Sequence, residues 1–416
     1  MQLLPGFRDF YPEECARRNY ILTQWREVAR RYGFVEYDGP VLEPMALYEK
    51  KSGGELVGQL FDFTDKGQRH VAMRPEMTPT LARMVAARER DFKKPLKWFC
   101  VPQFFRYEKP QRGRGREFYQ LNCDIIGEAS PAADAELLAV LIDTLRAFAL
   151  TEQDFVVRVS SRAAWQQFFA NAGGRAEDEY AFFQIVDKGE RTPPEKTGEA
   201  LSKFALPALT AEGVLEFMRS KTATAELAPI LDDLAARGMG GFVEIDYAIV
   251  RGLAYYTGVV FEVFDRSKNE RALTGGGRYD KLLHLMSDGK VDLPALGFGM
   301  GDVVLANLID DTPAAKARMA EWLARERACD IYAVIAKEER RADALALVQR
   351  LREAGHRTDF PLTEAKVGKQ FQTAEQLSAR LAVLIGDEWP QVKVKTLATR
   401  EEVLVAHGDL VAHLGV

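Results

Sequence analysis

Two strand-like segments, residues 98–107 and 117–127, flank a loop rich in arginine and glycine, and this pattern constrains the fold most. Both segments carry aromatic and β-branched residues, which favour extended strands. A short connection between two such strands predicts an antiparallel hairpin. Further strand patterns at residues 34–37, 41–42, 245–247 and 259–264 extend this prediction to an antiparallel sheet.

Helical patterns surround these strands. A helix is expected to begin at Pro12, because proline is tolerated in a first turn, and to end before Gly33. Another is expected from Thr78 to Arg90. Between about 155 and 240 the sequence is rich in alanine and charged residues and has weak strand signals. We therefore expect a helical insertion into the sheet domain.

A separate pattern follows a connector expected at residues 311–327. Apolar runs at 331–336 and 381–385 alternate with helical patterns at 342–355 and 370–380, and an alternating segment follows at 392–397. Such alternation predicts a mainly parallel or mixed sheet covered by helices. The predicted fold class is α+β, with an antiparallel sheet domain at residues 1–325 and a small α/β domain at 328–416.

The overall composition bounds the class of protein. At 416 residues the chain is too long for one compact core, so more than one domain is expected. A composition of 47% apolar and 28% charged residues is ordinary for a globular enzyme. The net charge of -5 excludes a uniformly basic surface, so nucleic-acid contacts must come from local patches. Neither a secretion signal nor an apolar stretch of membrane-spanning length is present, so a cytoplasmic enzyme without membrane contact is expected.

The loop between the two strands is the most informative candidate site. Its five cationic residues are Arg106, Lys109, Arg112, Arg114 and Arg116. Guanidinium groups match phosphate oxygens, and intervening glycines let backbone approach a ligand. A solvated hairpin tip explains such a loop about equally well. The following strand, however, places Gln120 and Asp124 on one face, and a polar face within an apolar strand points to a site.

Two further clusters carry polar chemistry. In Arg74–Thr78, Glu76 suits an ammonium group and Thr78 adds a hydrogen bond, although both residues also suit a helix cap. In Val250–Gly258, an arginine beside two tyrosines can present a charge and a phenol to a small ligand. The alternative is that the tyrosines belong to the core, and that the glycines of Thr274–Asp280 form a tight turn.

Other site types fit poorly. Gly275–Gly277 lacks the strand, helix and acidic residue of a dinucleotide-binding fingerprint. The five histidines and four cysteines are scattered without metal-ligand spacing, so no protein-held metal is expected. A glycine-rich strand and the start of a helix are expected at Gly297–Asp302.

Taken in order, these clusters resemble the histidyl-tRNA synthetases, which are class II aminoacyl-tRNA synthetases. The resemblance runs from Gly6 to Leu414 and is weakest in the insertion. Gly33–Pro44 resembles the family's dimer-forming motif 1, and Phe105–Gly127 resembles motif 2. Arg251–Tyr256 and Gly275–Asp280 resemble the two peptides that distinguish the histidine enzymes. The C-terminal segment resembles the family's anticodon-binding domain.

The resemblance implies a histidine–tRNA ligase that uses ATP and Mg²⁺, binds L-histidine and tRNA(His), and forms a homodimer. Arg106 and Arg251 are the implied catalytic residues on either side of the α-phosphate. The remaining implied roles are ATP binding by Glu108, Arg114, Phe118 and Arg278; histidine binding by Glu76, Thr78, Gln120, Asp124, Tyr255 and Tyr256, together with Arg251; and contact with the tRNA acceptor end by Gln111 and Arg112.

One position departs from the family pattern. Members place an arginine in the helix of motif 3, where Val304 stands here. An uncompensated loss of that contact would cost about 1.5–3 kcal/mol. Arg278 is the cation expected to substitute for it. Asp124 is one methylene shorter than the glutamate of many relatives, which is a minor change.

Two other functions fit parts of the sequence. A regulatory subunit of ATP phosphoribosyltransferase shares the catalytic fold and senses histidine, and Val304 favours this alternative. Arg251, the motif 2 arginines and the anticodon-like domain oppose it. A purely RNA-binding protein would leave Glu76 and Asp124 unexplained.

Overall fold

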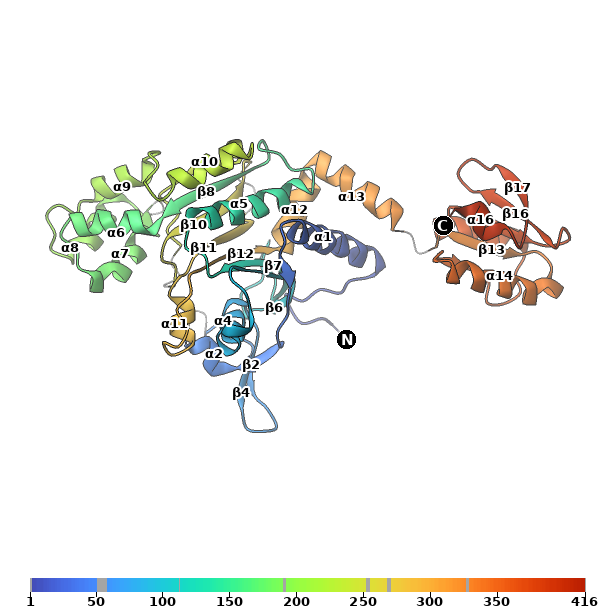
Figure 1. Cartoon of the computed structure of the whole chain (residues 1–416), viewed down its shortest axis with the longest axis horizontal. Helices are drawn as coiled ribbons and strands as arrows, with labels where there is room; N and C mark the ends of the chain where they lie inside the picture. The colour runs from blue at the N-terminus through green and yellow to red at the C-terminus, as the bar shows by residue number, and fades with distance from the viewer. Residues whose placement is uncertain are drawn as a thin grey trace. The chain divides into compact units, whose positions relative to one another are not determined.

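The computed structural model describes residues 2–50, 58–111, 113–189, 192–251, 255–267, 271–326 and 329–415. The chain forms two compact units, Met1–Met319 and Ala320–Val416 (Figure 1). The predicted domain boundary falls beside residues 327 and 328, which lie outside the described ranges.

A nine-stranded sheet forms the centre of the first unit. Its order is β1 (Val35–Glu36), β5 (Leu96–Cys100), β7 (Glu117–Ile126), β12 (Ala295–Gly301), β11 (Thr274–Arg278), β10 (Val259–Asp265), β8 (Phe155–Ser161) and β9 (Val243–Ile245), with β6 (Gln103–Phe105) also paired to β7. Only the edge pairs β1–β5 and β8–β9 are parallel among the described strands of this sheet. The predicted antiparallel sheet is therefore confirmed.

The predicted strand at 98–107 consists of two strands. β5 ends at Cys100 and β6 begins at Gln103, and both pair with β7 in one register. Pro102 has no N–H for the ladder, which explains the interruption. Its carbonyl still accepts a hydrogen bond of 3.1 Å from the backbone N–H of Gln120.

The two faces of the sheet have different covers. Helices α1 (Pro12–Arg31), α5 (Pro131–Arg146) and α12 (Asp302–Asp311) contact β7 from one side (Figure 1). Leu121, Cys123 and Ile125 of β7 are buried. Because side chains alternate along a strand, Gln120, Asn122 and Asp124 lie on the opposite face. That face also carries α4 (Thr78–Ala87) and α11 (Leu282–Met286), which pack on each other.

A small second sheet in this unit has the order β2 (Leu42–Pro44), β4 (His70–Met73) and β3 (Asp62–Thr64). The short helix α2 (Met45–Glu49) packs against it, and η1 (Glu89–Asp91) follows α4 in the chain. This sheet follows β1 in the chain and continues the segment predicted as strands near residues 34–42.

The helical insertion begins later than expected. Residues 155–161 form strand β8 of the main sheet, where their β-branched residues pair with β10. The insertion then contains α6 (Arg162–Asn171), η2 (Ala176–Asp178), α7 (Glu179–Val186), α8 (Pro194–Ser202) and α9 (Ala211–Arg219). Its core is aromatic, and the rings of Phe169 and Phe182 stack at 4.4 Å. α10 (Ala228–Ala236) packs on α5, and η4 (Gly240–Phe242) leads into β9.

The second unit contains a five-stranded mixed sheet, as predicted. The order is β14 (Thr358–Asp359), β13 (Ile331–Ile335), β15 (Leu381–Ile385), β16 (Gln391–Thr396) and β17 (Glu402–Ala406), with η5 (Glu338–Arg340), α14 (Arg341–Glu353), α15 (Val367–Gln376) and α16 (Leu410–Leu414). The first three strands are parallel and the last two pairs antiparallel. The expected connector contains a helix, α13 (Pro313–Arg325).

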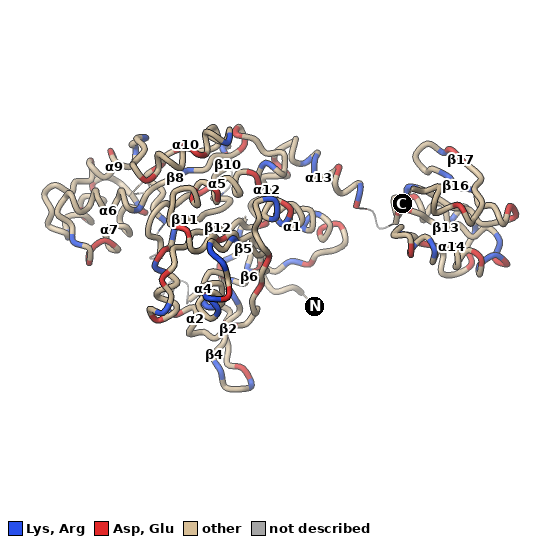
Figure 2. The backbone as a smooth tube through the Cα atoms, viewed as in Figure 1, with Lys and Arg blue, Asp and Glu red and all other residues tan. Residues whose placement is uncertain are grey.

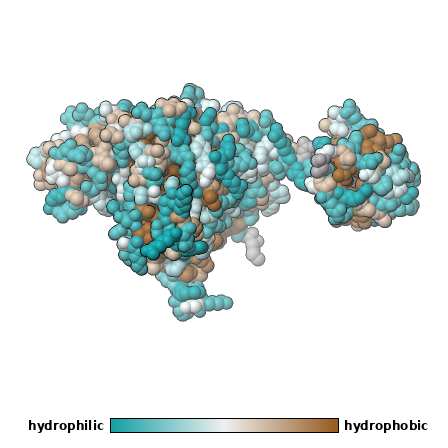
Figure 3. Space-filling model, in the orientation of Figure 1, coloured by the Kyte–Doolittle hydropathy of each residue, from teal (hydrophilic) through white to brown (hydrophobic). Residues whose placement is uncertain are grey.

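Charges of both signs are interspersed along both units (Figure 2). The face in Figure 3 is mostly hydrophilic, with scattered apolar side chains. Among the described helices, none combines the length and the hydropathy needed to cross a bilayer.

Candidate active site

A glycine floor lies on the polar face of the central sheet. We use this name for Gly275 and Gly277 of β11 and Gly297 and Gly299 of β12, which pair across the two strands. A Cβ at Gly275 would overlap the guanidinium of Arg251, and one at Gly297 would overlap the Asp124 carboxylate. Because these residues have no side chains of their own, functional side chains can lie directly against the backbone of both strands.

β7 supplies the polar wall beside this floor. Gln120 and Asp124 share one face as predicted, and a Cβ at Gly299 would lie 2.8 Å from Cδ of Gln120. Asn122, which stands between them and is buried, was not anticipated. Its position two residues from each predicted neighbour was the available signal.

Three tyrosines stand over the floor. Tyr279 donates a hydrogen bond to Asp124, and its ring lies edge-on to Tyr255 at 6.0 Å. The Tyr255 and Tyr256 ring centroids are 4.7 Å apart. Burial, reinforced by the negative charge of Asp124, raises the pKa of Tyr279 well above its ordinary value. Burial likewise raises the pKa of Tyr255, so both phenols remain protonated donors at neutral pH.

Arg251 reaches the floor from a constrained backbone. Its φ of 52° lies in the left-handed region that residues with a Cβ rarely adopt. Its Nη1 is 2.8 Å from Oε1 of Glu262, and its guanidinium lies 5.5 Å from the ring centroid of Tyr256. Burial acts to lower the pKa of Arg251, but Tyr256 and Glu262 outweigh it and raise the pKa. The neighbouring residues 252–254 lie outside the described ranges.

Arg106 provides a second, partly buried cation. Its Nε donates a hydrogen bond of 2.9 Å to the carbonyl of Pro75, and its guanidinium lies 5.2 Å from the ring centroid of Phe118. Burial lowers its pKa, while the nearby Glu76 carboxylate acts to raise it. A cation held this way is rigid and poorly hydrated, which strengthens its interaction with an anionic ligand.

The helix-cap alternative for Glu76 and Thr78 is not supported. Thr78 is the first residue of α4, and the N-cap residue, Met77, makes no side-chain capping bond. Glu76 instead lies close enough to Arg106 to influence its charge. The structure thus brings Glu76 to the same site as the loop arginine.

The motif 2 loop pairs two expected ATP-binding residues with each other. Glu108 and Arg114 form an ion pair, and the backbone of Arg114 also bridges Gln111. Burial lowers the pKa of Arg114, and the nearby cations Arg271 and Arg106 lower it further. Arg271 was missed because it precedes β11 without a motif of its own. Arg112 lies outside the described residues.

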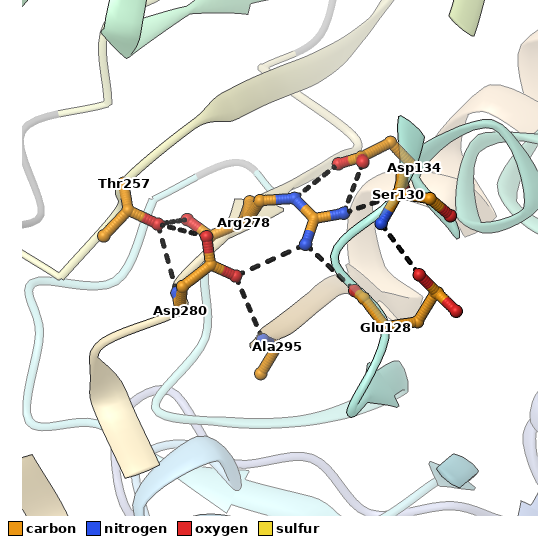
Figure 4. Close-up of polar contacts among 7 residues, drawn as sticks. All are labelled: Glu128, Ser130, Asp134, Thr257, Arg278, Asp280 and Ala295. Carbon is orange, nitrogen blue, oxygen red and sulfur yellow. Dashed lines mark hydrogen bonds and ion pairs between the residues drawn. The ribbon is translucent and has the colours of Figure 1, made fainter. Parts of the chain in front are cut away.

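Arg278 does not replace the motif 3 arginine, which corrects the expectation from the sequence. Its buried guanidinium forms an ion pair with Asp134 and lies 3.3 Å from Oδ1 of Asp280 (Figure 4). It also donates to the carbonyls of Glu128 and Ser130 at 3.1 and 3.4 Å. With its donors occupied by protein acceptors, the side chain is not available to a nucleotide. Most of these partners are distant from Arg278 in the sequence, so the sequence alone could not reveal them.

The start of α12 is held by a different cation. Val304 is buried, and Asp302 accepts hydrogen bonds of 3.0 Å from Nη2 of Arg8 and from the N–H of Tyr119. Nε of Arg8 also lies 2.7 Å from Oε1 of Glu117. Glu117 and Tyr119 alternate with Phe118 along β7, so this network lies behind the glycine floor.

A protein-held metal was not expected. Across the described parts of the chain, no group of three or more histidine, cysteine, aspartate or glutamate side chains is arranged to hold an ion.

Comparison with known proteins assigns this arrangement to a family. The family model for histidyl-tRNA synthetase matches residues 6–305, and that for the anticodon binding domain matches residues 330–415. The chain belongs to the histidyl-tRNA synthetase family. It therefore belongs to a family of ATP-dependent aminoacyl-tRNA ligases, as the sequence motifs predicted.

Relatives match over nearly their whole length. The histidine–tRNA ligase of Opitutus terrae is 45% identical and covers 96% of this chain and 95% of its own length. The histidine–tRNA ligase of Haloarcula marismortui is 37% identical, and the match covers 96% of this chain and 94% of that protein. The structure of histidyl-tRNA synthetase from Nostoc has a TM-score of 0.77 at 22% identity, and the match covers 99% of this chain and 98% of that one. This likeness supports the fold.

Proposed function

We propose that this histidyl-tRNA synthetase activates histidine with ATP and transfers it to the 3′ end of tRNA(His). In the first step, the histidine carboxylate attacks the α-phosphate and pyrophosphate leaves. In the second, the terminal tRNA hydroxyl attacks the carbonyl of the adenylate and AMP leaves. The observation that carries this proposal is the glycine floor, over which the Arg251 guanidinium, the Asp124 carboxylate and the Tyr279 phenol come together.

Histidine binding is assigned to the polar side of the floor. Asp124 accepts from an imidazole N–H, and Tyr256 contacts the other edge of the ring. Because Tyr279 donates to Asp124, it fixes the carboxylate in an acceptor orientation. We assign binding of the substrate ammonium to Glu76, Thr78 and Gln120. Tyr255 packs beside Tyr256.

ATP binding is assigned to the arginines. Arg106 and Arg251 contact the α-phosphate from opposite sides, where charge develops during attack. Arg114, joined by Arg271, binds the outer phosphates. Phe118 stacks on adenine. Glu108 accepts from the adenine amino group, so ATP separates this residue from Arg114 on binding.

Mg²⁺ accompanies ATP in this proposal and neutralises part of the phosphate charge. Phosphate oxygens and water are its main ligands, because the described residues offer no carboxylate cluster for it. The arginines then position the phosphates, since the protein fixes these side chains before the nucleotide binds.

The remaining assignments concern the contacts with tRNA and with a second copy of the chain. Gln111, with Arg112, contacts the tRNA acceptor end, and the second unit binds the anticodon. The segment that runs from the edge strand β1 to the start of β2 exposes Val35, Val41 and Leu42, at 62%, 44% and 46%. An exposed apolar edge is suited to pairing with another chain, so we assign the homodimer contact to this segment. We place the enzyme in the cytoplasm.

The regulatory alternative is less well supported. One similar structure is an ATP phosphoribosyltransferase regulatory subunit/histidyl-tRNA synthetase from Bacillus halodurans C. It has a TM-score of 0.71 at 22% identity, and the match covers 93% of this chain and 98% of that one. That likeness supports the fold alone. A protein that only senses histidine needs no arginines to bind phosphate, the role proposed here for Arg106 and Arg251. It also needs no domain like the one that matches the anticodon binding domain.

Histidine-dependent ATP–pyrophosphate exchange tests the proposal, with the other nineteen amino acids as controls. Exchange with histidine alone, followed by charging of tRNA(His), is the expected result. Histidine binding without exchange would instead identify a regulatory relative. The same assay shows whether Val304 is compatible with adenylate formation.

A further inference from the structure

The residue that joins the main sheet to the helical insertion also contacts the segment that carries Arg251. Arg162 is the first residue of α6, directly after β8, and only 5% of it is exposed. The preceding Ser161 accepts a hydrogen bond of 3.0 Å from the N–H of Ala164. This capping bond fixes the start of α6 and thereby the direction of the Arg162 side chain.

Arg162 contacts the 251–258 segment at both ends. Its backbone N–H donates to the carbonyl of Gly258 at 3.0 Å. Its Nη1 donates to the carbonyl of Arg251, also at 3.0 Å. One residue therefore ties down the beginning and the end of the segment that carries Arg251, Tyr255 and Tyr256.

The contact with Arg251 falls where the backbone most needs support. A residue with a Cβ adopts a φ of 52° only when its surroundings determine it. The Arg162 hydrogen bond holds the carbonyl that follows this torsion. It thereby helps to aim the Arg251 side chain across Gly275 toward Glu262, 2.8 Å away.

The other side of the Arg162 guanidinium faces the insertion. It lies 4.0 Å from the ring centroid of Phe183 on α7, a cation–π distance. Glu179, Asp187 and Tyr180 of the same region, as well as Tyr256, stabilise its charge, although burial prevails and lowers its pKa to about 10. Arg162 thus links the packing of the insertion to the backbone of Arg251.

We propose that Arg162 is a positioning residue for Arg251, through which the helical insertion influences adenylate formation. This inference rests on the proposed function. Arg162 itself touches neither histidine nor ATP. It acts by holding the Arg251 carbonyl, so its removal weakens stabilisation of the transition state more than it weakens binding of histidine.

The test compares Arg162→Gln with Arg352→Gln in histidine-dependent adenylate formation. Arg352 is a matched control, because its guanidinium also donates to a backbone carbonyl, that of Thr358, and lies over Phe360 at 5.5 Å, but in the second unit. Arg162→Gln is expected to lower kcat by about 10- to 100-fold. It should change the KM for histidine less than about threefold. Arg352→Gln should leave both unchanged.

A double-mutant cycle separates positioning from a general structural role. If Arg162 acts through Arg251, the Arg162→Gln/Arg251→Ala variant is no slower in single-turnover adenylate formation than Arg251→Ala alone. Rates that fall multiplicatively would overturn the proposal. So would a kcat for Arg162→Gln equal to that of the unmodified chain.

Arg162→Lys covers the case in which the glutamine variant fails to fold. It keeps the charge over Phe183 but loses the planar fork, so a severalfold lower kcat with a nearly unchanged melting temperature is expected. An unchanged kcat in this variant would overturn the proposal as well. Absence of exchange by the unmodified chain would overturn the proposed function instead, so the two failures are distinguishable.

Discussion

The phenol of Tyr279 donates a hydrogen bond to the Asp124 carboxylate above Gly297, where a side chain would prevent their meeting. Tyr279→Phe removes only this hydroxyl. We expect the KM for histidine to rise roughly fivefold, because a net contribution of about 1 kcal/mol is lost, and kcat to change little. Pyrophosphate exchange at varied histidine measures both, with Tyr332→Phe in the second unit as the control. An unchanged KM would remove Tyr279 from the recognition of histidine.

The glycine floor should not tolerate even one methyl group. In Gly275→Ala, the new Cβ would displace the guanidinium of Arg251. We expect adenylate formation to slow by about 100-fold, since small misplacements of a catalytic group have effects of this size. Gly408→Ala is the control, because nothing lies within 4 Å of its added Cβ. Comparable rates for the two variants would contradict the assignment.

Arg278 is expected to matter for stability and not for ATP. Arg278→Lys keeps the charge but loses most of the donors that reach Asp134 and Asp280, which should cost about 1–3 kcal/mol of unfolding free energy. The KM for ATP should stay within about twofold. Arg114→Lys is the matched comparison and should show the reverse pattern. Denaturant unfolding and ATP-dependent exchange, measured on both variants, decide the question.

Glu136 gives a pH-dependent contribution to stability. Burial opposes its ionisation, but Lys97 and Arg237, at 2.6 and 2.7 Å, outweigh burial and lower its pKa below 4.5. Its charge therefore stabilises the fold above about pH 4.5, and this contribution disappears as the pH falls through the lower folded-state pKa. Glu136→Gln should cost up to about 1 kcal/mol at pH 6.

Unfolding free energies of the chain and of Glu136→Gln, compared at pH 6 and at pH 3.5, measure this contribution. The difference should shrink at the lower pH. Glu212→Gln, at an exposed position on α9, serves as the control. A difference that grows on acidification would show that the sign is wrong.

The apolar edge near β1 should determine the oligomeric state. Val35→Asp places a charge on a side chain that is 62% exposed and belongs to a short edge strand. We expect the proposed dimer to dissociate to monomers at micromolar concentration, because a desolvated charge opposes an apolar interface. Light scattering after gel filtration measures the mass. Leu362→Asp, on a side chain of the second unit that is 82% exposed, should leave the proposed dimer intact.

Much of the fold could be predicted from the sequence because its signals are local. The alternation along β7, the start of α1 at Pro12 and the glycine-rich β12 each follow from a few consecutive residues. Strand β8 was assigned to the insertion because seven residues beside a long helical segment give little periodic signal. Its pairing with β10 is a contact between distant parts of the chain.

The site was less predictable where partners decide a residue's role. Gln120 and Asp124 could be placed on one face by spacing alone. Arg278 could not, because a guanidinium in a glycine-rich segment looks equally suited to phosphate or to carboxylate. Only the approach of Asp134 from α5 decides between them. The same is true of Arg162, whose two backbone acceptors lie in a segment distant in the sequence.

The order of strands in the main sheet also affects how the chain can fold during synthesis. The central strand β7 pairs with β12, and Ile126 opposite Ala295 closes one end of that ladder. At roughly 5–20 residues per second, the intervening chain takes on the order of 10–30 s to emerge from the ribosome. Until then β7 has an unpaired edge, which is open to the wrong strand or to another nascent chain. In the second unit, β13 waits for β15 only while the chain from Ile335 to Leu381 is made, which at the same rate takes on the order of 2–10 s.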